Sequence, residues 1–236
     1  MVELLLRLMI IGRALNRLIA ISLVGVLFTG CSTAVVVVEG AVPRPLVEPY
    51  PITVAVFFPE SLKNYKLVDD GTGRNERSWE IDIGEAQLNL WETILPAVFE
   101  TVVFVESYDD LKNLDVDAIF APDISEMQYS NPKYTGLDVW EIWFEYQFRW
   151  FEKSQIEPTD KGGIDHIESV AYSTWKTTAY GKIPFDPSIV APSDEASVEM
   201  AAIKALRDTG ASFILSLPAD TGFRSLIANR ETENED

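Results

Sequence analysis

One stretch of the chain decides the fold, and it reads Trp140-Glu141-Ile142-Trp143-Phe144-Glu145-Tyr146-Gln147-Phe148-Arg149-Trp150. Every even position is apolar or aromatic, whereas all odd positions except Trp143 are polar or charged. A strand places all the even side chains on one face, but a helix would place Ile142 and Phe148 among the charged residues. The stretch therefore predicts a long strand with one buried face.

The sequence after this stretch supplies a partner strand. Gly162-Gly163 marks a turn, and residues 164–178 are rich in Ser, Thr, Val, Tyr and Trp, which favour strands. We expect residues 164–178 to return antiparallel to the long strand. The connection from Glu152 to Gly163 is longer than a tight hairpin allows, so we expect it to project as a loop.

Four shorter segments before residue 140 also have the character of strands. They cover residues 52–58, 79–83, 101–105 and 116–121. The first of them is apolar without a break, which is typical of a fully buried strand, whereas the second alternates and predicts a half-buried one. Pro59 and Pro122 are expected to end the first and the last segment, because proline donates no hydrogen bond to a sheet.

Two segments have the period of helices. From Gly84 onward, apolar residues recur at spacings of three or four, namely Leu88, Trp91, Leu95, Val98 and Val102. Pro96 lies inside this pattern and is expected to kink the helix.

The second helix is predicted to begin near Ser193. The Ser193 hydroxyl can accept hydrogen bonds from the first free amides, while Asp194 and Glu195 complement the positive helix end. Gly210 could end this helix, or residues 211–217 could continue it or form a strand.

The order of these elements predicts a single α/β (α+β) domain over residues 52–228. We expect a mixed, largely antiparallel sheet with two main helices packed on one face. An acidic tail, residues 229–236, is expected to be disordered. The element order is similar to that of small α/β domains of envelope accessory proteins, such as the N-terminal domain of the Tol-system translocation protein and the curli-secretion lipoprotein.

The first thirty residues have the order of a secretory signal peptide. Three basic residues, Arg7, Arg13 and Arg17, precede an apolar stretch over residues 18–28. That stretch is too short to cross a bilayer, which takes about 20 apolar residues. Small residues and the only cysteine of the chain, Cys31, follow it.

Residues 27–31, Leu-Phe-Thr-Gly-Cys, resemble the lipobox of bacterial lipoproteins, with Phe28 where that family prefers Leu. The resemblance implies cleavage after residue 30 and acyl chains on Cys31, which would anchor the protein without a membrane-spanning helix. Since Ser32 is not the Asp that retains such proteins at the inner membrane, it also implies the outer membrane. The alternative is a buried free cysteine after an ordinary signal peptide.

Residues 31–51 are predicted to form the lipidated N-terminus and a tether. Four prolines at positions 43, 45, 49 and 51 favour an extended spacer that lifts the body off the membrane. The valine run at residues 35–38 could instead be a first strand. Loss of Arg7, Arg13, Arg17 and Glu3 with the leader changes the formal charge from −18 to −20.

Charge and composition exclude several function classes. A chain with 19 basic and 37 acidic residues cannot neutralise phosphate backbones, so nucleic-acid binding is excluded. His166 is the only histidine, and Asp165-His166 just after a turn fits an exposed strand position. Without a second histidine or a mature thiol, we expect no zinc or copper site, no cofactor and no enzyme activity. The carboxylates Asp109, Asp110, Asp115 and Asp117 are interpreted as loop charges.

These observations predict a lipid-anchored outer-membrane lipoprotein that faces the periplasm. We expect a non-enzymatic accessory or assembly partner of another envelope protein, with Trp143 on the polar face of the long strand as part of the partner surface. Packing in the core or at an edge is the alternative role for Trp143. A carrier of lipid or glycan in an aromatic-lined pocket is a second hypothesis, and a carboxylate-based hydrolase is a distant third.

Overall fold

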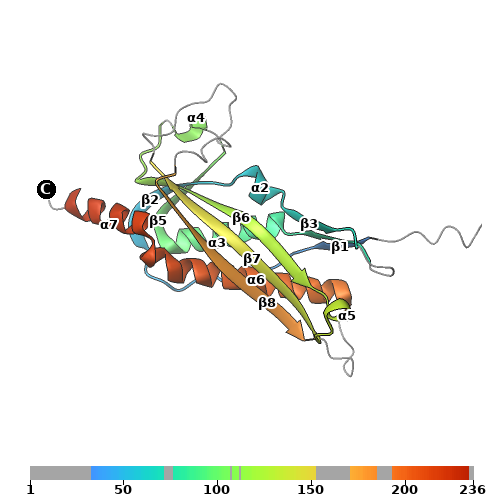
Figure 1. Cartoon of the computed structure of the whole chain (residues 1–236). Coiled ribbons are helices and arrows are strands. Elements are labelled where there is room, and N and C mark those ends of the chain that lie inside the picture. Colours follow the sequence, from blue (N-terminus) through green and yellow to red (C-terminus); the bar gives the residue numbers. More distant parts are fainter. Residues whose placement is uncertain are drawn as a thin grey trace, which may run out of the picture.

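The computed structural model describes residues 33–71, 77–106, 108–111, 113–152, 171–184 and 193–233. Its main sheet has the strand order β5-β2-β6-β7-β8, and a smaller sheet has the order β1-β4-β3. The long strands β6, β7 and β8 lie in front of helices α3 and α6 in Figure 1. The predicted mixed α/β class, with two main helices on one face of the main sheet, is confirmed.

The strands and helices have the following bounds. The main sheet contains β2 (Tyr50–Phe57), β5 (Phe99–Val105), β6 (Ala118–Ser130), β7 (Val139–Phe151) and β8 (Ser173–Pro184), and the small sheet contains β1 (Ala34–Val37), β3 (Lys66–Asp69) and β4 (Trp79–Asp82). The helices are α2 (Glu60–Lys63), α3 (Gly84–Val98), α4 (Tyr108–Leu111), α5 (Pro132–Thr135), α6 (Asp194–Ser216), η3 (Leu217–Ala219) and α7 (Thr221–Glu233). Strand β2 pairs parallel with β5 and β6, whereas β6, β7 and β8 pair antiparallel.

The even face of β7 forms the centre of the core, as its alternation predicts. All six even residues from Trp140 to Trp150 are at most 1% exposed. The Trp91 ring of α3 meets Phe148 of β7 and Phe213 of α6, with ring centroids 5.4 Å apart in both pairs. The small sheet covers the inner face beyond α3, where Trp79 contacts Trp140. Burial of these large rings is what holds the two layers together.

Helix α6 also covers the free edge of β8. A Cβ at Gly181 would lie 2.0 Å from the carbonyl oxygen of Ala201, so only glycine permits this approach. Asp208 accepts a hydrogen bond from the Tyr180 amide (2.9 Å), and Lys204 donates to the carbonyl of Lys182 (3.1 Å). Side chains of α6 thus pair with backbone groups that an edge strand would leave exposed.

The outer face of the main sheet has a second core at one end. Its buried members are Ala55, Phe57, Val105, Leu111, Ile119, Ala121 and Phe151. Burial on β7 is therefore not limited to the one face that the sequence predicted, since at the end of the strand Arg149 is 8% and Phe151 is 2% exposed. Over the first two thirds of β7 the odd face is not covered in this way.

The valine run forms strand β1, so the alternative prediction of a first strand is correct for these residues and the prediction of a tether is wrong. Ala34, Val36 and Val38 are buried, and β1 pairs parallel with β4. The segment that follows also lies on the body, because Arg207 donates a hydrogen bond to the carbonyl of Ala41 (3.0 Å). The folded body therefore begins before residue 52, the boundary that we expected from the prolines.

Other boundaries differ from the sequence predictions. Strand β6 does not end at Pro122 but continues to Ser130. Its pairing with β2 ends at Phe120, so the β2-facing edge of β6 has no partner strand at Pro122 and the missing amide hydrogen of this proline is tolerated there. Helix α3 contains Pro96 but ends at Val98, so Val102 belongs to β5. Helix α6 continues past Gly210, whose missing Cβ leaves room for Ile94 of α3.

The C-terminal part of the chain was predicted with the largest errors. Strand β8 is the antiparallel partner of β7 as expected, but it spans residues 173–184 rather than 164–178. The predicted turn and loop, residues 152–163, lie outside the described residues from position 153 onward. Helix α7 was not predicted, and it includes residues 229–233 of the tail that we expected to be disordered.

Candidate partner-binding surface

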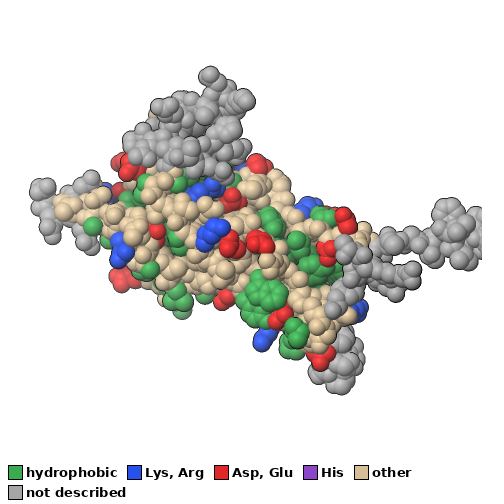
Figure 2. Space-filling view, in the orientation of Figure 1, with side chains coloured by type: hydrophobic (Ala, Val, Ile, Leu, Met, Phe, Trp, Pro, Cys, Tyr) green, Lys and Arg blue, Asp and Glu red, His purple; other side chains and the backbone are tan. Residues whose placement is uncertain are grey.

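The uncovered part of the outer face of β6, β7 and β8 contains Trp143, and we call it the open face. Its residues are Glu126, Gln128, Glu141, Trp143, Glu145, Lys176, Thr178 and Tyr180. The registers place Gln128, Trp143 and Tyr180 side by side in one row across the three strands. A second row consists of Glu126, Glu145 and Thr178. Figure 2 shows hydrophobic side chains gathered over β7 and β8 on this side of the molecule, with charged side chains beside them.

Trp143 and Tyr180 form an aromatic pair at the centre of the open face. Their ring centroids lie 5.3 Å apart with an interplanar angle of 35°, and Trp143 is 37% exposed. The Tyr180 hydroxyl donates a hydrogen bond to Glu141, and this bond to a carboxylate raises the pKa of Tyr180 to about 12. The pair is therefore held in one orientation while a large aromatic surface stays accessible to solvent.

A hollow of about 270 Å³ opens beside the aromatic pair. Its lining consists of Glu126, Gln128, Trp143, Phe144, Glu145 and Thr178. The register between β6 and β7 shifts between Ile124 and Glu126, so Ser125 is an extra residue in β6. Such a bulge bends the strand and re-aims the side chains next to it. The hollow lies at this irregularity, where it could receive a side chain of another protein.

Two carboxylates, Glu126 and Glu145, lie opposite each other on the open face. Each has its own donor: Gln128 donates to Glu126 (2.6 Å), and Lys176 forms an ion pair with Glu145 (2.6 Å). The arrangement places charges of both signs around the aromatic pair.

Most of the other residues that the sequence singled out are not placed here. Cys31, Ser32, Asp165 and His166 lie outside the described residues. Asp117 is structural, because it accepts a hydrogen bond from the Thr53 amide (2.7 Å).

The described residues contain neither a membrane-spanning helix nor a cluster of metal ligands. No helix among them is long and apolar enough to cross a membrane. No group of three or more His, Cys, Asp or Glu residues among them could hold a metal ion.

Sequence reasoning found Trp143 but missed its neighbours. Tyr180 and Thr178 face it because β8 pairs with β7 at residues 173–184, whereas the sequence predicted a partner strand over residues 164–178. Glu126 and Gln128 were missed because Pro122 was taken to end their strand. The alternation of Gln128 with inward-facing Met127 and Tyr129 was the available signal for them.

Comparisons with known proteins give distant similarities only. No family model and no curated protein matches this chain. Among solved structures, the chain is similar to protein XCC0632 of the DUF330 family from Xanthomonas campestris, at 10% identity over 85% of this chain and 99% of that one, with a TM-score of 0.46. It is also similar to a minor lipoprotein from Acinetobacter baumannii, at 13% identity over 79% of this chain and 96% of that one, with a TM-score of 0.34. At these TM-scores neither similarity supports an argument, so the function has to be argued from the chain itself.

Proposed function

We propose that this chain is a lipid-anchored envelope protein that acts as a non-enzymatic accessory or assembly partner of another envelope protein. Acyl chains on Cys31 hold it in the outer membrane, facing the periplasm. The support for the anchor is the resemblance of residues 27–31 to a lipobox, together with the position of the only cysteine of the chain. The support for a protein partner is the open face.

The exposed aromatic pair is the observation that carries the partner proposal. The chain has a formal charge of −18, yet Trp143 and Tyr180 form a tilted pair of rings on the open face, where Trp143 is 37% exposed. Tryptophan and tyrosine are the residues that most often dominate the energy of protein interfaces. An aromatic pair next to a hollow of about 270 Å³ gives a partner both an aromatic surface to pack against and a place to insert a side chain.

The surroundings of the pair have the composition of an interface rim. Glu141, Glu145 and Lys176 surround the rings with charges that are already paired by hydrogen bonds or ion pairs. An apolar centre within a polar, solvated rim is the usual anatomy of a protein interface. Since both signs of charge are present, we expect a partner with a mixed surface rather than a strongly basic one.

Site-specific photocrosslinking in intact cells tests this proposal. A photoreactive amino acid at Thr178, exposed on the open face, should capture a defined envelope protein, whereas the same amino acid at Met200 should not. Met200 lies on α6 and is 37% exposed, as Trp143 is, so it controls for exposure. Capture of the same proteins from both positions, or of none from Thr178, would contradict a partner surface on the open face.

A carrier function has one specific observation in its favour. A second hollow, of about 370 Å³, lies between the start of β2, η3 and α7, and its lining consists of Tyr50, Pro218, Phe223, Arg224, Ile227 and Ala228. An apolar wall with one cation suits an acyl chain with an acidic head, at the low end of ligand pocket sizes. If the protein is a carrier, a fluorescent fatty acid should bind it, and Ile227→Trp, which fills the hollow, should abolish the binding.

A further inference from the structure

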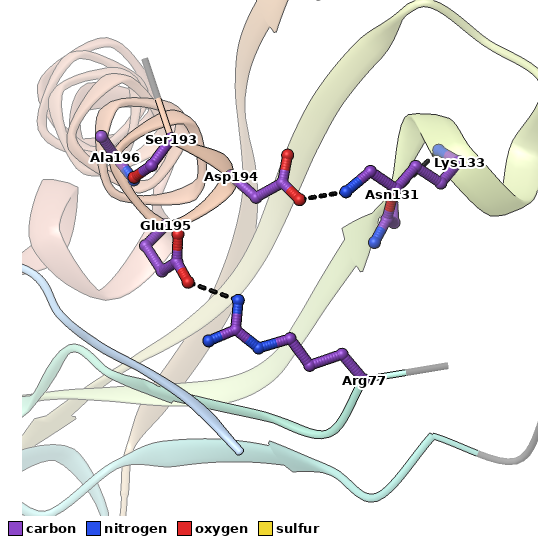
Figure 3. Close-up of polar contacts among 7 residues, drawn as sticks. All are labelled: Arg77, Asn131, Lys133, Ser193, Asp194, Glu195 and Ala196. Atoms are coloured by element: carbon purple, nitrogen blue, oxygen red, sulfur yellow. Dashed lines mark hydrogen bonds and ion pairs between the residues drawn. The ribbon is translucent and has the colours of Figure 1, made fainter. Parts of the chain in front are cut away.

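One end of the domain gathers the start of β1 with the starts of β4 and α6, and we call it the β1 end. The Ala34 amide donates a hydrogen bond to the carbonyl of Ser78, at the start of β4 (2.8 Å). Arg77, next to Ser78, forms an ion pair with Glu195 in the first turn of α6. Lys133 of α5 forms another ion pair with Asp194, as Figure 3 shows. These contacts fix four elements at the same end of the molecule.

The chain between Cys31 and this end is very short. Three peptide units separate Cys31 from Ala34, so their Cα atoms can be at most about 11 Å apart. A spacer that extended to residue 51 would instead have allowed a separation of about 66 Å. Because β1 belongs to the small sheet, an anchor on Cys31 leaves almost no free chain between bilayer and body.

We infer that the β1 end lies directly against the surface of a phospholipid bilayer. This inference rests on the proposed acylation of Cys31. An acyl anchor holds the cysteine at the level of the lipid head groups, and about 11 Å of chain keeps the start of β1 next to them. Two acidic residues of this end have their charge balanced, since Asp194 is paired with Lys133 and Glu195 with Arg77.

The outer face of the small sheet adds an apolar surface beside this end. Val35 and Val37 of the edge strand β1 and Val68 of the opposite edge strand β3 are 50–62% exposed. Glu80 and Asp82 of the central strand β4 lie between these edges, and both form ion pairs with Lys66 of β3 (3.0 Å and 2.9 Å). Exposed valines with paired charges suit contact with lipid head groups better than the unpaired acidic surface that the composition of the chain predicts.

This orientation also places the open face. Strand β7 begins near the β1 end, since Asn131 and Lys133 connect it to β6 there, and Trp143 follows four residues later, about 14 Å along the strand. Helix α6 runs about 35 Å away from the same end and leads to α7. The aromatic pair therefore faces a partner close to the membrane, whereas α7 points away from it.

Lipid-quenching measurements on the lipidated full chain test this inference. Acylation consumes the Cys31 thiol, so Val68→Cys and Asn229→Cys each provide a single site for a fluorophore, one near the β1 end and one on α7. The labelled proteins are bound to phosphatidylethanolamine vesicles that contain a lipid with a head-group nitroxide. We expect quenching to be several-fold stronger at position 68 than at position 229.

A linker variant is the matched control. Insertion of about twelve Gly and Ser residues between Ser32 and Thr33 adds a span of about 20 Å, which should lower the quenching at position 68. Persistent quenching there would also support the inference, with the exposed valines as its cause. Equal quenching at both positions in protein that floats with the vesicles would overturn this inference alone. Failure to float with vesicles would overturn the lipid anchor itself and the inference with it.

Discussion

Trp143 and Phe144 are neighbours on β7 with opposite environments. Phe144 is 1% exposed in the core, whereas Trp143 lies on the open face and contacts Tyr180. We expect Phe144→Ala to lower the free energy of unfolding by about 3–5 kcal/mol and to reduce the protein level in cells. Trp143→Ala should cost about 1 kcal/mol at most but abolish partner capture. Urea unfolding and crosslinking from Thr178 measure the two effects.

Trp143→Ala and replacement of His166 together separate binding from chemistry. Joint replacement of Asp165 and His166 should leave function unchanged, because the proposal gives them no role. Full activity of Trp143→Ala together with loss of function on replacing His166 would contradict the partner surface and would favour an enzyme.

Glu195 provides a test of the β1 end that depends on pH. Its own backbone amide and the Arg77 guanidinium hold the pKa of Glu195 below its usual value of 4.5. A lowered pKa in the folded state means that the stabilisation is present above the unfolded-state value and is lost as the pH falls through the folded-state value. We expect Glu195→Gln to cost about 0.5–1 kcal/mol at neutral pH and close to nothing in acid.

Urea unfolding of both proteins across this pH range measures the difference. A double-mutant cycle with Arg77→Ala isolates the share of the ion pair. The same loss of stability at neutral and at acidic pH would show that the carboxylate charge is not what stabilises this helix start.

At the scale of elements, two glycines hold α6 in place by different contacts. A Cβ at Gly181 would meet the backbone carbonyl of Ala201 at 2.0 Å, whereas one at Gly210 would meet the terminal methyl of Ile94 at 2.3 Å. Backbone cannot yield, but a side-chain end can rotate away. We therefore expect Gly181→Ala to cost about 3 kcal/mol and Gly210→Ala about 1 kcal/mol, measured by thermal or urea unfolding. A larger cost for Gly210→Ala would mean that the α3–α6 contact is the stiffer one.

Strand β7 could be predicted from sequence because one of its faces is buried along its whole length. Segments without such a continuous buried face were the ones predicted wrongly or not at all. The valines of β1 give no period, so they could not be assigned to tether or strand, and β3 has only four residues. The register of β8 depends on the length of its connection to β7, which turn residues alone did not define.

At the scale of the whole molecule, sequence predicted the main layers but not what covers their ends. The alternation of β4 predicted a half-buried strand and the valine run of β1 was an alternative strand, but β3 was not predicted and the sequence did not indicate that the three form a sheet of their own. The second core was indicated by the unbroken apolar run of β2, which needs cover on both faces. Trp143 could be selected because it is the one apolar residue on a polar face, but the aromatic pair exists only through the pairing of β7 with β8.

Acylation of Cys31 is the claim on which localisation, function and membrane orientation all depend. Labelling of growing cells with a palmitate analogue, followed by mass spectrometry of the mature N-terminus, tests it most directly. The account predicts a chain that begins at Cys31, carries two or three acyl chains and loses all label in Cys31→Ala. Undiminished labelling of Cys31→Ala, or a mature chain with a free Cys31 thiol, would contradict it.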